Sequence, residues 1–198
     1  IGTQLVAKGL DFSNVGLVGI VSADISLNIP DFRSAERTFQ LITQAAGRAG
    51  RGSYPGKVLI QSYTPEHYSI TAAANHDYEA FYLTECTIRK QIGYPPYSDL
   101  FQVIISSESE LEAHEKAGEV AEEFIKNTGS SEEKYILGPQ AAPMNKIKGH
   151  YRYQILIKCF PGKRKLYSKV LNEIKLKINT DRKAKYLISI DINPYNFL

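Results

Sequence analysis

The 198-residue sequence has no tryptophan, one methionine and two cysteines, and these scarcities exclude several classes of protein. Cys86 and Cys159 stand far apart without Cys-x-x-Cys spacing, so we expect no zinc site and no disulfide framework. No run of 18 or more apolar residues occurs, which predicts that the chain neither spans nor partners with a membrane. The first residues lack the pattern of a signal peptide, so we expect a cytoplasmic location.

The sequence otherwise has the composition of an ordinary globular protein, with 43% hydrophobic and 23% charged residues. Its length is enough for one large or two small domains. The chain begins with Ile1 inside a recognisable motif, which indicates a fragment of a longer protein.

Charge is strongly segregated along the chain. Residues 1–100 hold 8 Lys/Arg and 9 Asp/Glu, residues 101–143 hold 3 and 9, and residues 144–198 hold 13 and 3. A basic final third favours a surface that faces a polyanion, and a solvated lysine-rich face is the alternative.

The first half alternates strand and helix. A short apolar run at 17–21 predicts a buried parallel strand, residues 33–49 predict a helix capped by Asp31, and residues 56–63 predict a second strand. This α/β order is typical of a RecA-like lobe, of which only the C-terminal part is present, so we expect an exposed edge and exposed apolar surface. Thr64 and Pro65 predict a helix start, with a break near residues 75–77.

Gly93-Tyr94-Pro95-Pro96 must end this helical region near Ile92, and it divides the chain into domains 1–92 and 93–198. The second domain predicts strand 100–106, helix 111–126, a strand near 135–137, strand 151–160, helix 163–178 and strand 186–192. Ser109 and Glu112 suggest a capping box for the first helix. The order βαββαβ is that of a ferredoxin-like α+β domain.

The segment Gln44-Ala45-Ala46-Gly47-Arg48-Ala49-Gly50-Arg51 predicts a glutamine and two arginines on one helical face. Converging guanidinium groups suit the charge on a transferring phosphoryl group, whereas a simple helix end explains only one arginine and one glycine. The pattern resembles motif VI of superfamily 2 helicases, and Gly2-Thr3-Gln4 with Lys8-Gly9-Leu10-Asp11-Phe12 resembles their motif V.

Three further segments are similar to the PriA family of replication-restart helicases: Ala23 to Arg37, Gly93-Tyr94-Pro95-Pro96-Tyr97, and Tyr151 to Ile157. This resemblance covers essentially the whole chain. It implies an ATP-dependent 3′→5′ DNA helicase that recognises stalled or branched forks and promotes primosome assembly. It also implies catalytic contacts to the γ-phosphate from Gln44, Arg48 and Arg51, nucleotide contacts from Gly9 and Asp11, and DNA contacts from Thr3 and Lys8.

The phosphate loop Gly-x-x-x-x-Gly-Lys-Ser/Thr and an Asp-Glu-x-His box do not occur in the sequence. We therefore expect this chain alone to be inactive as an ATPase and to carry no bound cofactor. ATP and Mg²⁺ would belong to the full-length parent, and the family's zinc segment would lie outside this chain.

Basic and aromatic residues interleave between 146 and 154, a mixture that can hold phosphates and stack bases or receive an acidic peptide tail. We predict DNA contacts from Lys146, Lys148 and Arg152, whereas an ordinary strand with tyrosines on one face is the alternative. By resemblance, Arg152 and Gln154 would bind the tail of single-stranded-DNA-binding protein. A second basic set predicts contacts with the phosphate backbone of a nucleic acid: Lys163-Arg164-Lys165, Lys175, Lys177, Arg182-Lys183 and Lys185.

Two other functions stay open from the sequence. One is a different superfamily 2 DNA translocase, which an upstream zinc insertion and fork-end-binding domain would exclude. The other is a non-catalytic module that binds DNA or protein partners.

Overall fold

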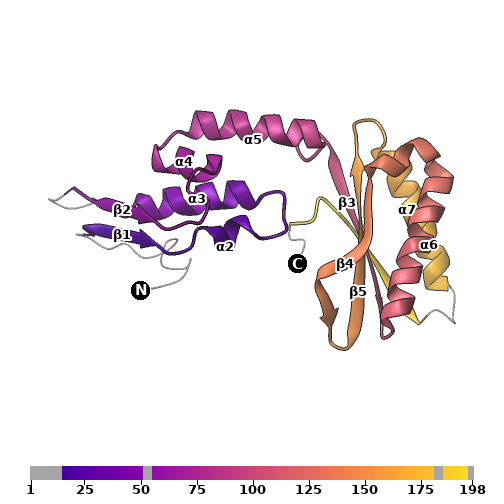
Figure 1. The fold of residues 1–198 in the computed structure, drawn as a ribbon. Coiled ribbons are helices and arrows are strands. Elements are labelled where there is room, and N and C mark those ends of the chain that lie inside the picture. The colour runs from indigo at the N-terminus through magenta and orange to yellow at the C-terminus, as the bar shows by residue number, and fades with distance from the viewer. Residues whose placement is uncertain (1–14, 51–54, 181–184, 196–198) are drawn as a thin grey trace. The chain divides into compact units, whose positions relative to one another are not determined.

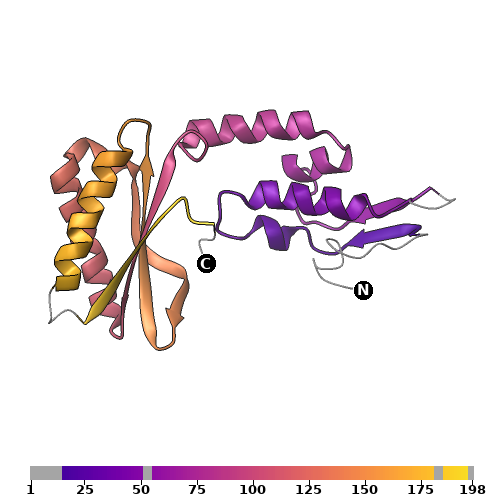
Figure 2. The ribbon, with the colours of Figure 1, turned by 180° about the vertical axis from the view of Figure 1, so that it is seen from behind.

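The computed structural model describes residues 15–50, 55–180 and 185–195. The chain divides into two compact units, residues 1–88 and 89–198, so the division falls four residues before the predicted domain boundary. Figures 1 and 2 show the elements of each unit.

The first unit pairs strands β1 (Leu17–Ile20) and β2 (Lys57–Ile60) in parallel. Helices α2 (Asp24–Leu27), α3 (Ser34–Ala46) and α4 (Tyr68–Ala74) lie in the same unit, and α5 (Tyr78–Ile92) starts there. Its core contains Phe39, Ile42, Ile70 and Phe81, with the Phe39 and Phe81 rings stacked at 4.3 Å between centroids.

Two expectations for this unit are corrected. The strand at 17–21 is not buried on both faces, since Leu17 is 59% exposed and Val21 is 77% exposed. Thr64 does not cap a helix, because α4 begins at Tyr68 with His67 as its N-cap. The hydroxyl of Thr64 instead donates to the Asp24 carboxylate at 3.3 Å. The exposed side chains of Leu17 and Val21 confirm the expected exposure of apolar surface in this unit.

The end of α5 belongs to the second unit, and the helix ends at Ile92 as predicted. Gly93 then adopts a φ of +65°, and an added Cβ there would lie 2.7 Å from the Phe160 ring. The Lys158 ammonium donates to the Ile92 carbonyl at 2.6 Å and lies 4.3 Å from the Tyr94 ring centroid. Burial lowers the pKa of Lys158.

Four strands and two helices form the rest of the second unit: β3 (Asp99–Ser107), α6 (Glu110–Thr128), β4 (Ile136–Ile147), β5 (His150–Cys159), α7 (Arg164–Thr180) and β6 (Tyr186–Ile192), with a 3₁₀ helix, η1, at Ser130–Tyr135. The sheet order is β4-β5-β3-β6, and every neighbouring pair is antiparallel. This arrangement confirms the predicted ferredoxin-like βαββαβ topology.

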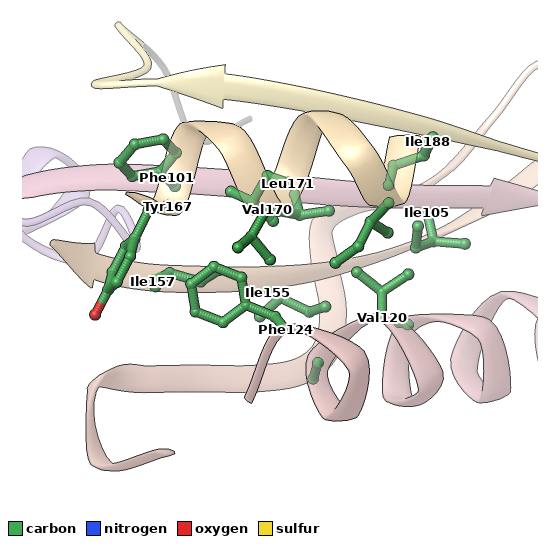
Figure 3. Close-up of a cluster of buried hydrophobic side chains, with 14 of the residues drawn as sticks. Phe101, Ile105, Val120, Phe124, Ile155, Ile157, Tyr167, Val170, Leu171 and Ile188 are labelled. Carbon is green, nitrogen blue, oxygen red and sulfur yellow. The ribbon is translucent and has the colours of Figure 1, made fainter. Parts of the chain in front are cut away.

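Helices α6 and α7 pack on one face of this sheet (Figures 1 and 2). Figure 3 shows that alternate strand residues, among them Phe101, Ile155 and Ile157, point toward these helices. Tyr167 is fully buried, and its ring meets that of Phe124 edge to face at 4.9 Å. We call the opposite face, which points away from α6 and α7, the second face of the sheet.

Two details of the second unit differ from expectation. Strand β4 runs to Ile147, ten residues beyond the predicted end at Leu137. Pro139 and Pro143 argue against a strand when only the sequence is considered. The strand lies at a sheet edge, however, where a missing N–H donor costs no hydrogen bond of the sheet. Ser109 caps α6 through the Glu112 N–H, but the Glu112 carboxylate accepts from Ser107, so the capping box is half formed.

Candidate functional site

The predicted phosphate-sensing segment begins in the last turn of α3. This helix ends at Ala46, three residues before the predicted end, and Gly47 follows as its C-cap. Gln44 is exposed in the last helical turn, whereas Arg48 is half-buried in the turn that follows, where its N–H donates to Ala45 at 3.1 Å. The prediction that Gln44 and Arg48 share one face of the helix is therefore wrong, because the helix stops before Arg48.

Other residues predicted for nucleotide and DNA contact, Thr3, Lys8, Gly9, Asp11 and Arg51, lie outside the described residues. Two glycines that follow Arg48 in the sequence, Gly50 and Gly56, pack closely against each other. Gly50 has a φ of +75° and donates to the Val15 carbonyl at 2.9 Å. A Cβ on Gly56 would lie 2.2 Å from the Gly50 nitrogen, so both positions require glycine.

In the segment from Ala23 to Arg37, which carries much of the resemblance, the Asp24 and Asp31 carboxylates form structural hydrogen bonds. Asp24 is 7% exposed and accepts from the Ser62 hydroxyl at 2.8 Å and from the Tyr63 N–H at 3.1 Å. Burial alone would raise the pKa of Asp24, but these hydrogen bonds hold it below its ordinary value. Asp24 thereby fixes the connection after β2 to the start of α2.

Asp31 does not cap α3, whose N-cap is Arg33 without a side-chain bond. Its carboxylate instead accepts from the Arg33 N–H at 2.9 Å and forms an ion pair with Arg37 at 3.1 Å. The Ser34 hydroxyl donates to the Ile29 carbonyl at 2.6 Å. These contacts shape the entry to the helix that carries Gln44.

Three of the residues predicted to bind DNA, Lys146, Lys148 and Arg152, lie on the β4–β5 hairpin. Lys148 and Gly149 both have positive φ, +49° and +88°, as a two-residue type I′ turn requires. The Lys146 ammonium lies 4.0 Å from the Tyr151 ring centroid and donates to its hydroxyl at 2.9 Å. Arg152 donates to the Met144 carbonyl at 3.2 Å, which holds its guanidinium beside the same hairpin.

Gln154 lies on the same face of β5 as Arg152 but differs in accessibility. It is 3% exposed, and its side-chain oxygen accepts from the Gln102 amide at 2.9 Å. Arg152 is half-buried, whereas Lys146 and Lys148 are exposed. Lys146 and Tyr151 lie on the face of the sheet toward α6, because Tyr151 pairs with Ser107, whereas Arg152 lies on the second face. The partner-binding role of Gln154 stays a prediction.

The second basic set is divided by the structure. Lys163 pairs with Glu132, and Arg164 lies 3.4 Å from Asp99. Lys177 lies 2.7 Å from Glu123 on α6, and Lys185 is exposed immediately before β6. Arg182 and Lys183 lie outside the described residues.

Glu132 is a buried residue that sequence reasoning missed. It is 5% exposed and accepts from both Lys163 and the Tyr167 hydroxyl. These hydrogen bonds lower the pKa of Glu132, and burial together with the same bond raises the pKa of Tyr167. The network ties η1 to α7 and is structural.

Cys159, His67 and His114 have structural positions. Cys159 is 1% exposed, and burial raises its thiol pKa to about 11. His67 caps α4, and the His114 ring packs edge to face on Tyr153 at 5.0 Å. Within the described ranges, no cluster of three or more His, Cys, Asp or Glu side chains suits a metal, and no helix is long and apolar enough to cross a membrane.

The chain is similar to known proteins over its whole length. Residues 90–195 match the model of the primosomal protein N C-terminal domain. The replication restart protein PriA of Bacillus subtilis (strain 168) is 49% identical over 197 residues, which are 98% of this chain and 24% of that protein. PriA of Borreliella burgdorferi is 40% identical over 201 residues, covering 100% of this chain and 29% of that protein.

PriA of Synechocystis is 38% identical, with 98% of this chain and 22% of that protein covered. The chain thus spans about a quarter of the length of the curated relatives that it matches, and it corresponds to their C-terminal part. These matches extend through both units, and the chain belongs to the PriA family of replication restart proteins.

Proposed function

We propose that this chain is the C-terminal part of an ATP-dependent 3′→5′ DNA helicase that acts at stalled or branched replication forks and promotes primosome assembly. Within it, the β4–β5 hairpin binds DNA, and the residues at the end of α3 contact nucleotide in the complete motor. The observation that carries the DNA-binding role is the Lys146–Tyr151 pair next to the turn that holds Lys148.

The hairpin has the properties that a single-stranded nucleic acid needs. Lys146, Lys148 and Arg152 supply positive charge for phosphates, and Tyr151 supplies a ring on which a base can stack. The type I′ turn holds these side chains on a short, ordered connection rather than on a long loop. Little ordering entropy is then lost when a ligand binds.

The second face of the sheet is a poorer site for bases. Its central strands carry Leu100, Gln102 and Ile104 on β3, opposite Lys158, Leu156 and Gln154 on β5. These positions hold no aromatic ring, whereas sheet-face recognition of single strands relies on aromatic stacking. The hairpin is therefore favoured over the sheet face for base contact.

The motor role rests on Gln44, Arg48 and Arg51, together with Thr3, Lys8, Gly9 and Asp11. Arginines near a γ-phosphate stabilise the charge that develops during transfer. The phosphate loop is absent from this sequence, so the fragment alone is expected to be inactive. ATP and Mg²⁺ would bind in the full-length parent, and its zinc would be held by residues outside this chain.

Arg152 and Gln154 are proposed to help bind the acidic tail of single-stranded-DNA-binding protein. The half-buried guanidinium of Arg152 can meet a carboxylate, while the buried Gln154 amide positions its neighbours through Gln102. The second candidate function is a non-catalytic module, which the same hairpin supports without any motor. We place the protein in the cytoplasm, where replication takes place in bacteria.

ATP hydrolysis by the full-length parent, with and without fork DNA, tests this proposal. We expect fork-stimulated hydrolysis, and we expect the double variant Lys146→Gln/Lys148→Gln to need more DNA for half-maximal stimulation with the saturated rate unchanged. Hydrolysis that is absent with and without DNA would favour the non-catalytic module. An unchanged DNA requirement would remove the hairpin from the DNA site.

A further inference from the structure

One exposed lysine, Lys185, directly precedes β6 at the end of the sheet where the β4–β5 turn lies. Ser106 on β3 lies opposite Arg152 on β5 and opposite Leu187 on β6. Arg152 and Leu187 therefore occupy one row across the second face, two strand spacings or about 10 Å apart.

Nearer the hairpin, Ser107 pairs with both Tyr151 and Tyr186, and the residues directly before these two are His150 on β5 and Lys185. Side chains two residues apart lie on one face of a strand, about 7 Å from each other. Lys185 and Leu187 are both exposed, and Leu187 is 66% exposed. An accessible row thus runs from the hairpin across β3 to the edge strand β6.

Other cations of the second basic set lie elsewhere. Arg164 pairs with Asp99 at 3.4 Å, and Asp99 lies opposite Cys159 at the other end of β3. Lys163 at the same end is held by Glu132. Lys185 is therefore the described member of the set that the register places beside the hairpin.

Carboxylates limit the path that a polyanion can take. Glu110 and Glu112 stand in the first turn of α6, where they accept from Tyr153 at 3.4 Å and from Ser107. Asp191 lies four residues beyond Leu187 on β6, about 13 Å toward the other end. Glu108 is exposed directly after β3, next to Ser107, which pairs with both Tyr151 and Tyr186.

We infer that Lys185 is a phosphate-binding residue that extends the hairpin site into a track across the end of the sheet. A single-stranded nucleic acid would pass from the Lys146–Tyr151 pair around the turn at Lys148 to Arg152 on the second face, and leave over Lys185. Charge complementarity selects this ligand, because these cations surround one end of the sheet over a span that a few nucleotides can cover. The inference rests on the proposed function of the hairpin.

Binding of a fluorescein-labelled dT20 oligonucleotide to the 198-residue chain at several salt concentrations tests this inference. Each phosphate contact to a single strand contributes about 0.7 to the slope of log K against log salt. Lys185→Gln should therefore lower the slope by about 0.7 and weaken binding about fivefold at 0.1 M salt. The matched control Arg164→Gln removes the same charge at the other end and should leave both quantities unchanged.

Equal effects of the two variants, or no effect of Lys185→Gln, would overturn the inference. Should Lys146→Gln/Lys148→Gln weaken binding while Lys185→Gln does not, the hairpin site stands and only the track fails. Should neither weaken binding, the proposed function of the hairpin fails as well. A gain variant guards against misfolding: Glu108→Gln removes the nearby carboxylate and should strengthen dT20 binding, and unchanged binding would contradict the track.

Discussion

Lys146 and Tyr151 face each other across the β4–β5 hairpin, with the ammonium 4.0 Å from the ring centroid and 2.9 Å from the hydroxyl oxygen. The pair combines a phosphate-binding charge with a surface for base stacking, two residues from the turn on either side.

Tyr151→Ala should weaken dT20 binding about tenfold, because stacking on one aromatic ring contributes about 1–3 kcal/mol per base. Tyr151→Phe keeps the ring and loses only the hydroxyl bond to Lys146, so its binding should stay within about twofold of wild type. Fluorescence anisotropy measures both. Tyr63, which is 91% exposed in the first unit, supplies the control variant Tyr63→Ala. Equal losses in the phenylalanine and alanine variants would exclude a stacking role.

Arg51→Ala in the full-length parent should lower ATP turnover by about 10³–10⁵ while largely sparing DNA binding, because an arginine finger acts on the transferring phosphate. Steady-state ATPase assays and a DNA-binding titration on the same preparation measure the two effects. Unchanged turnover, or loss of the fold by circular dichroism, would contradict the assignment of Arg51.

Acid should destabilise the second unit through Glu132. Hydrogen bonds from Lys163 and Tyr167 lower the folded-state pKa of Glu132 below its ordinary value of 4.5. Its contribution to the free energy of unfolding is therefore complete above that ordinary value and is lost as pH falls through the lowered folded-state pKa. Urea unfolding from pH 7 to pH 3 should show this loss in wild type and a flatter profile in Glu132→Gln. The same profile in both proteins would refute the stabilising role of Glu132. The substitution Glu133→Gln, at the exposed neighbouring residue, is the control.

The two cysteines should differ in reactivity. Cys159 is buried with a thiol pKa of about 11, whereas Cys86 is half-buried. Since the thiolate is the reactive form, iodoacetamide at neutral pH should modify Cys86 well before Cys159 in the folded chain. Mass spectrometry of the digested protein reads both sites. Faster modification of Cys159 would show that the core of the second unit opens readily.

Periodicity alone predicted the second unit well, because its helices and central strands bury alternate or helically spaced apolar residues such as Phe124, Ile155 and Ile188. Strand β6 has the predicted bounds, residues 186–192. Strand β4 was missed beyond Leu137, since its prolines are tolerated only because the strand lies at an edge, and edge position is a property of the whole sheet.

Some contacts join partners that are distant in sequence. Thr64 was predicted to cap a helix, but Asp24, 40 residues earlier, accepts its hydroxyl. Gln154 forms a buried hydrogen bond with Gln102, 52 residues earlier, which the sequence did not indicate. Lys146, Lys148 and Arg152 are close in sequence and lie on one hairpin, and their role in DNA binding stays a prediction. The proposed role of Lys185 near that hairpin depends on the order of the strands, which cannot be derived from the sequence.

Nuclear magnetic resonance mapping of dT20 on the ¹⁵N-labelled 198-residue chain tests the central claim most directly. The account predicts that amide shifts on titration concentrate at Lys146–Arg152 and at Lys185–Leu187, and that they diminish as salt is raised. Shifts confined to the start of α7 or to the opposite end of β3, or no shifts at all, would contradict it.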